Sequence, residues 1–150
     1  MYKTESFDVG ESFFRVGCSC VPEDFLDLES NDDGHWFLPH VVNLAFACEL
    51  FLKSLLSDGD SMFFGHNLAD LFSKLDESIK HEILHSTSFD GDERFLLKLT
   101  ENAQCYDEWR YIFEHSKHKV IDIVFLENLA DELHFLAKKH LTEISPTKED

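Results

Sequence analysis

Apolar residues between Trp36 and Leu56 occupy almost every side of the helix that this segment predicts: Val41, Val42, Leu44, Ala45, Phe46, Ala47, Leu50, Phe51, Leu52, Leu55 and Leu56. A helix without a polar face belongs at the centre of a protein, where other helices cover it. Glu49 and Lys53 lie one turn apart within this helix. We expect them to pair, because neither charge is tolerable by itself in a covered helix.

Apolar residues at helical spacing predict three further long helices. The first begins at Asn67, a favourable N-cap, and runs to about Ile83 with one dry side. After a loop over 86–92, the second spans about Glu93–Ser116, and the last runs from about Ile121 to 142. Four long helices with short connections predict an all-α fold, an antiparallel up-and-down bundle.

The N-terminal 35 residues do not continue this pattern. Phe13 and Phe14 form an apolar spot, and Pro22 can open a short helix that runs to about Glu29. We therefore expect an irregular N-terminal extension over 1–35 with one short helix. The bundle then occupies 36–142, and 143–150 form a loose polar tail.

Composition narrows the class of protein. The chain has 150 residues, which fit one domain, and a net charge of -17. Such a charge disfavours broad electrostatic capture of nucleic acid, so no DNA partner is expected, but it leaves a local cationic site or a basic partner protein open. The N-terminus lacks an apolar signal core and no run approaches a membrane span, so we expect a cytoplasmic protein without a membrane partner.

The four cysteines are expected to be unpaired thiols. Cys48 and Cys105 fall inside helical patterns, where a thiol behaves as a small hydrophobic group. Cys18 and Cys20 form a C-x-C pair, and a second pair that would complete a tetrahedral metal site is absent from the sequence.

The segment from Trp109 to His115 carries the clearest chemical signal, because it places Arg110 and His115 five positions apart. Arginine holds phosphate charge and histidine moves a proton near neutral pH, so the pair can act on a phosphodiester. On a regular helix the two side chains diverge by about 140°. They converge only if the helix ends or distorts near Glu114, or if a twofold-related copy supplies the second group. The segment is equally compatible with a structural clasp between Arg110 and Glu114.

A polar cluster is also predicted inside the bundle, from Glu49, Lys53, His66, Arg110 and Glu114. It is either a salt-bridged network that fixes the register of the helices or part of a ligand site. His66 directly precedes the Asn67 cap, so it can simply brace that turn.

Three segments match one pattern in order and spacing over about residues 36–137. They are Asn43–Leu56 (NLAFACELFLKSLL), Gly65–Phe72 (GHNLADLF) and Trp109–Glu114 (WRYIFE). These segments resemble the N-x-A-F-A-x-E-L-x-L-K-x-L, G-H-x-L-x-x-L-F and W-R-Y-x-Y-E motifs of HEPN-like proteins (higher eukaryotes and prokaryotes nucleotide-binding).

The resemblance implies a helical bundle that is often paired as a homodimer. In many members an Arg-x4-6-His motif forms a metal-independent ribonuclease site across the dimer, and Arg110 and His115 match this motif. Such members are commonly toxins or phage-defence effectors, some partnered with a small nucleotidyltransferase, whereas others have lost catalysis and serve in binding or assembly. Tyr111 departs from the pattern, because active members usually carry a polar residue directly after the arginine.

We therefore expect a toxin- or defence-type RNA endonuclease that acts as a homodimer and needs no metal or other cofactor. Arg110 would bind and polarise the phosphate, His115 would move the proton, and Tyr111 and Glu114 would shape the site. Glu49, Lys53 and His66 would support it. A further partner would be an antitoxin or a nucleotidyltransferase. The alternative is a non-catalytic helical module that binds a protein or a nucleotide.

A remote alternative comes from His81-Glu82-x-x-His85, which matches the zinc metalloprotease signature. Two imidazoles one turn apart can hold zinc while the glutamate activates water. The phase of the helix opposes this interpretation, because Ile79 and Ile83 define the core side and place His81 toward solvent.

Overall fold

The computed structural model describes residues 2–20, 37–57, 64–86, 88–110 and 122–144. These residues form seven α-helices and no β-strand, which confirms the all-α class. The helices are α1 (Tyr2–Ser19), α2 (Phe37–Leu55), α3 (Leu68–Ser73), α4 (Glu77–Leu84), α5 (Asp92–Glu101), α6 (Cys105–Arg110) and α7 (Ile123–Ile144).

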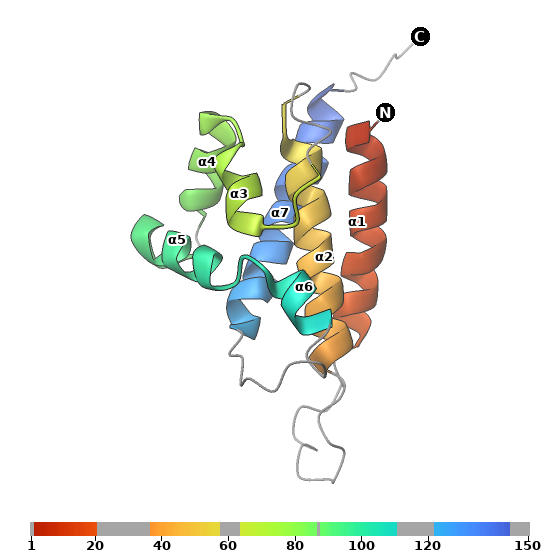
Figure 1. Cartoon of the computed structure of the whole chain (residues 1–150). Coiled ribbons are helices and arrows are strands. Elements are labelled where there is room, and N and C mark those ends of the chain that lie inside the picture. The colour runs from red at the N-terminus through yellow and green to blue at the C-terminus, as the bar shows by residue number, and fades with distance from the viewer. Residues whose placement is uncertain (1, 21–36, 58–63, 87, 111–121, 145–150) are drawn as a thin grey trace, which may run out of the picture.

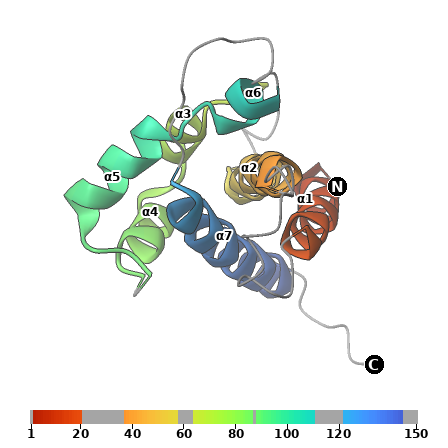
Figure 2. The same cartoon turned by 90° about the horizontal axis from the view of Figure 1, so that it is seen from below.

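Three long helices lie side by side, and four short helices complete the described fold (Figure 1). α1 runs antiparallel to α2, whereas α2 and α7 run in the same direction. The end view places α2 between α1 and α6, with α7 beside it, and α3, α4 and α5 on the side of α7 away from α1 (Figure 2). The expected arrangement of four long antiparallel helices is therefore not seen in the described part of the chain.

The central position expected for α2 is confirmed. Val41, Ala45, Ala47, Cys48 and Phe51 have no exposed surface. By length and composition α2 also meets the criteria for a membrane span, contrary to the expectation that no segment approaches one. Its apolar character has another explanation, because 67% of that segment is buried inside the protein.

The prediction of an irregular extension over 1–35 was wrong for its first half, because α1 is an 18-residue helix packed along α2. Gly10 and Gly17 lie seven residues apart on the buried face of α1. A Cβ atom at Gly10 would lie 3.0 Å from a ring carbon of Phe51, so the absence of a side chain allows the close approach of the two helices. The helix predicted at Pro22–Glu29 lies outside the described residues.

The long helix predicted from Asn67 to Ile83 is two helices. The Asn67 side chain accepts a hydrogen bond from the Asp70 amide at 3.0 Å, which confirms the N-cap. α3 ends at Ser73, and α4 begins only after Asp76. The apolar stripe survives the break: Leu71, Phe72, Leu75, Ile79 and Ile83 are all buried. The stripe therefore predicted the buried side correctly but did not reveal the change of helix axis.

The helix predicted at Glu93–Ser116 is also interrupted. α5 follows Gly91, whose φ of +95° lies in the left-handed region that favours glycine, and ends at Glu101. Asn102 is buried, and its side-chain oxygen accepts a hydrogen bond from the Asp122 amide at 3.3 Å. Residues 111–116 lie outside the described part. The last predicted helix is confirmed as α7, with Phe125, Leu129, Leu133 and Leu136 buried as expected.

Candidate functional site

The short helix α6 presents Arg110 at the surface because its neighbour is an anchor. Trp109 is 7% exposed, and its ring meets Phe37 edge-on with the centroids 5.9 Å apart. Cys105, one turn earlier, is also buried. Successive helical positions point about 100° apart, so a buried Trp109 turns Arg110 away from the core. The Arg110 side chain is 40% exposed.

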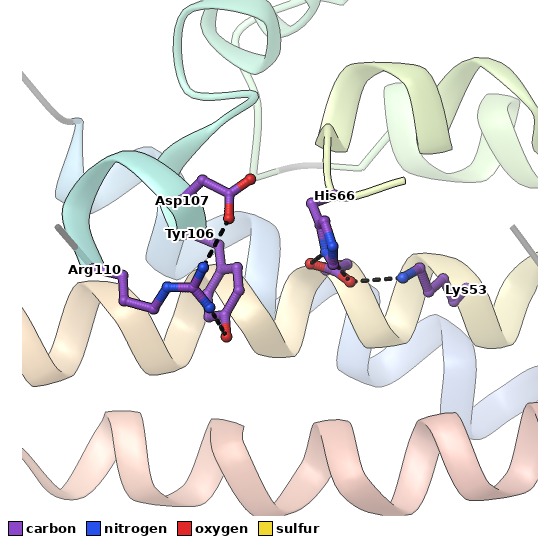
Figure 3. A network of polar contacts seen from close by, with 6 residues as sticks. Lys53, His66, Tyr106, Asp107 and Arg110 are labelled. Carbon is purple, nitrogen blue, oxygen red and sulfur yellow. Dashed lines mark hydrogen bonds and ion pairs between the residues drawn. The ribbon is translucent and has the colours of Figure 1, made fainter. Parts of the chain in front are cut away.

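Two residues of the same helix hold the Arg110 guanidinium. Its Nη1 donates a hydrogen bond to the Tyr106 hydroxyl at 2.8 Å, and Nη2 lies 3.4 Å from Oδ1 of Asp107 (Figure 3). The central carbon of the guanidinium lies 4.6 Å from the centroid of the Tyr106 ring, a cation–π contact. The clasp expected between Arg110 and Glu114 stays a prediction, because Glu114 lies outside the described residues.

Three aromatic rings in contact, Tyr106, Phe46 and Phe13, connect this arginine to α2 and α1. Tyr106 stacks on Phe46 of α2 with ring centroids 4.7 Å apart, and Phe46 meets Phe13 of α1 at 4.6 Å. The Tyr106 ring therefore lies between Phe46 and the guanidinium. A nucleobase has no open face of that ring on which to stack, so Tyr106 is a support rather than a base-binding platform.

A second polar group lies beside the first and is centred on a buried carboxylate. Glu49 is 1% exposed; Lys53 donates a hydrogen bond to its Oε1 at 2.7 Å. His66 Nδ1 lies 3.0 and 3.1 Å from the two oxygens of the same carboxylate. A carboxylate accepts hydrogen bonds, so Nδ1 of His66 carries the proton. Half of the His66 side chain remains exposed.

The predicted polar cluster is therefore assembled in part. Glu49, Lys53 and His66 come together as expected. Arg110 belongs to the neighbouring group, and the two groups adjoin where the rings of His66 and Tyr106 lie 6.2 Å apart (Figure 3). Tyr111, Glu114 and His115 lie outside the described residues, so the structure places Arg110 but not the other three residues of the expected catalytic set.

The zinc-protease motif lies on α4, and its side chains are engaged in other contacts. His81 is exposed and Ile83 is buried, as the helix phase predicted. The rings of His81 and His85 stack with centroids 3.8 Å apart. Glu82 accepts a hydrogen bond from Lys139 of α7 at 2.8 Å, and this contact is the main reason that its pKa is lowered. Among the described residues, no group of three or more His, Cys, Asp or Glu side chains is arranged to hold a metal ion.

Sequence reasoning missed one buried histidine that joins three helices. His40 of α2 is 2% exposed; its Nδ1 lies 2.8 Å from the Gly17 carbonyl of α1, and its Nε2 lies 2.7 Å from Oε1 of Glu127 on α7. Both contacts are made to oxygen atoms, so the His40 ring links α2 to α1 on one side and to α7 on the other. Its partners lie 23 and 87 positions away, so sequence spacing offered no signal.

Three of the four thiols have a raised pKa, which disfavours the reactive thiolate. All four cysteines are free, as expected. Burial raises the pKa of Cys105 to about 12 and that of Cys48 well above its ordinary value. Burial and the nearby Asp131 also raise the pKa of Cys18, which lies beside His40.

Comparisons of the chain with models of known protein families, with curated proteins and with solved structures found no match.

Proposed function

We propose that this protein is a HEPN-like effector of toxin or defence type that binds and cleaves RNA, acting as a homodimer in the cytoplasm without a metal ion. The observation that carries the proposal is the presentation of Arg110. The Arg110 side chain is 40% exposed, and its guanidinium lies against the Tyr106 ring. A cation held in this way is suited to a phosphate, because the planar donors of arginine match the oxygens of a phosphodiester.

The proposed reaction is an intramolecular transesterification of an RNA phosphodiester. The 2′-oxygen attacks phosphorus and loses its proton, while the bond from phosphorus to the 5′-oxygen breaks and that oxygen gains a proton. The products are a 2′,3′-cyclic phosphate and a 5′-hydroxyl. Arg110 stabilises the charge on the phosphate oxygens, and His115 moves the proton at the attacking or leaving oxygen. The nucleophile belongs to the substrate, so the reaction needs no metal-bound water.

The homodimer follows from the family resemblance and from helix geometry. Residues 110 and 115 are about 140° apart around a regular helix, so one chain brings both side chains to a phosphate only with a local distortion. A twofold-related copy removes that requirement. Dimerisation also gathers cationic side chains of two chains around one substrate, which offsets the net charge of -17 on each. An antitoxin or a nucleotidyltransferase is the partner class that the resemblance implies.

The second candidate function is a non-catalytic helical module that binds a protein or a nucleotide. One observation favours it: the described partners of Arg110, Tyr106 and Asp107, belong to its own helix. In this alternative the contacts stabilise α6, and Glu49, Lys53 and His66 fix how α2 meets the segment before α3.

Expression in bacteria separates the two functions. Wild type is compared with Arg110→Ala and His115→Ala, and Arg94→Ala is the matched control because Arg94 is an exposed arginine paired with Asp90 at 3.6 Å. We expect wild type and the control to slow growth and degrade RNA, and both site variants to be harmless. Purified wild type should cleave labelled single-stranded RNA in the presence of EDTA and leave a cyclic phosphate end. Harmless expression of all four proteins with intact RNA would favour the binding module.

A further inference from the structure

The two described side-chain contacts of Arg110 differ in a way that matters for anion binding. The contact with Tyr106 is short, 2.8 Å, and the ring beneath the guanidinium adds a second attraction. The hydroxyl is neutral, so this contact fixes the cation without neutralising it. The contact with Asp107 is 3.4 Å, longer than the roughly 2.7–2.9 Å of a good charged hydrogen bond, and it joins two charges.

The Asp107 carboxylate is placed where it can be exchanged. The side chains of Asp107 and Arg110 are 49% and 40% exposed, so water and dissolved ions reach both partners. A surface ion pair of this kind is weak, because water screens the two charges. A phosphate group can bind a guanidinium through two parallel hydrogen bonds, which is a stronger geometry than the 3.4 Å contact with Asp107.

We infer that Tyr106 is the positioning residue for Arg110 and that Asp107 is an internal counter-ion, which a phosphate group must displace to bind there. This inference rests on the proposed role of Arg110. Asp107 occupies the cation when no substrate is present and lowers its affinity for anions. Tyr106 keeps the guanidinium in place during the exchange. The substrate class is a phosphodiester or another phosphate-bearing chain, whose affinity for the site is limited by Asp107.

The test is a titration with inorganic phosphate in which binding is monitored through the NMR signal of the Arg110 side-chain Nε–H. This signal is assigned by its disappearance in Arg110→Lys. Asp107→Asn keeps the size of the side chain and removes its charge. Asp90→Asn is the matched control: it removes one negative charge from a second described Arg–Asp pair, Arg94–Asp90, whose side chains are 63% and 83% exposed. Tyr106→Phe keeps the ring and removes the hydroxyl.

We expect Asp107→Asn to tighten phosphate binding at Arg110 by about two- to fivefold, the range of a surface ion pair. Asp90→Asn should leave it unchanged, and Tyr106→Phe should weaken it by about twofold or more. If Asp107→Asn and Asp90→Asn have equal effects, the tighter binding comes only from the change in the protein's net charge, and the inference is overturned. An unchanged affinity in Asp107→Asn, or no phosphate response at Arg110 in any variant, would overturn it as well.

The titration requires no cleavage, so the inference and the proposed function can fail separately. If phosphate displaces Asp107 at Arg110 but RNA stays intact, the nuclease proposal is refuted, while the inference about Asp107 as a displaceable counter-ion stands. Where RNA is cleaved, Asp107→Asn should lower KM with little change in kcat, because Asp107 acts on binding and touches no reacting atom.

Discussion

The two polar groups of the candidate site, one around Glu49 and one around Arg110, differ in how far their charged pairs are exposed to water. The Glu49–Lys53 pair is 1% and 8% exposed and closes to 2.7 Å, whereas the Arg110–Asp107 pair is 40% and 49% exposed and stays at 3.4 Å. Removing charges from water is costly, so the buried pair is tolerated only while each partner is present. The exposed pair has kept its hydration and loses little when it opens. Burial therefore favours a structural role for the Glu49–Lys53 pair, whereas exposure leaves the Arg110–Asp107 pair able to exchange partners, as we propose.

The largest effect is expected from breaking the buried pair. Lys53→Met leaves the Glu49 carboxylate with His66 as its remaining described partner, inside the core. We expect the free energy of unfolding to fall by about 3–5 kcal/mol, measured by urea denaturation. Lys80→Met is the matched control, because Lys80 pairs with Glu77 at 2.9 Å while Glu77 is 90% exposed. That variant should lose less than about 1 kcal/mol.

A double variant sharpens the same comparison. Glu49→Leu combined with Lys53→Met replaces both charges with apolar groups of similar size, and it should recover most of the stability that Lys53→Met loses. A double variant as unstable as the single one would show that the pair, together with His66, holds the start of α3 in place. Glu49, Lys53 and His66 would then contribute to stability by positioning α3, in addition to neutralising one another's charges.

An intermediate effect is expected at the Lys98–Asp122 pair, whose side chains are about one third exposed. Asp122 also accepts a capping hydrogen bond from the Phe125 amide at 2.9 Å, at the start of α7. Asp122→Ala loses the cap and the ion pair and should cost about 1–2 kcal/mol. Asp122→Asn keeps a side-chain oxygen for the cap and should cost less. Equal losses in the two variants would assign the whole effect to the charge.

The pH dependence of Asp122 has a definite sign. Hydrogen bonds from Lys98 and from the Phe125 amide lower its pKa from the ordinary 3.8. A lowered folded-state pKa contributes stability above the unfolded value, and that contribution is lost as the pH falls below 3.8 through the folded pKa. Urea midpoints of wild type should therefore approach those of Asp122→Asn on acidification. A constant difference between them down to pH 2 would contradict this assignment.

The sequence predicted most accurately what depends on neighbours along one helix. The Glu49–Lys53 pair, the Asn67 cap and the buried stripe of α7 follow from spacings of three to seven residues. The helix breaks were missed, because the apolar stripe continues through Leu75 and because Asn102 is held by the Asp122 amide twenty positions later. α1 was missed for a related reason: Gly10 and Gly17 weaken a helix by propensity and strengthen this one by contact with α2.

The candidate site also contains features that the sequence predicted and one that it did not. That Arg110 faces outward follows from the buried Trp109 beside it, and the pairing of His66 with Glu49 agrees with the predicted cluster. The support of Arg110 by Tyr106 was not foreseen, although the two residues lie one turn apart, because an aromatic residue at helical spacing usually indicates only packing. Tyr106 does both: its ring packs on Phe46, and its hydroxyl accepts a hydrogen bond from the arginine.

The smallest effect on stability is expected where the largest effect on function is proposed. Arg110→Ala removes a long ion pair, a cation–π contact and the hydrogen bond to the Tyr106 hydroxyl. All three lie at the surface, where water replaces the lost contacts, so the free energy of unfolding should fall by about 1 kcal/mol or less. Far-UV circular dichroism is the suitable signal, because the fluorescence of the adjacent Trp109 reports the substitution itself. A loss above about 2 kcal/mol would place Arg110 with the buried pair as a structural residue. A stable, folded Arg110→Ala that no longer binds RNA would instead separate the arginine's chemistry from its packing, which is the distinction that burial draws between the two groups.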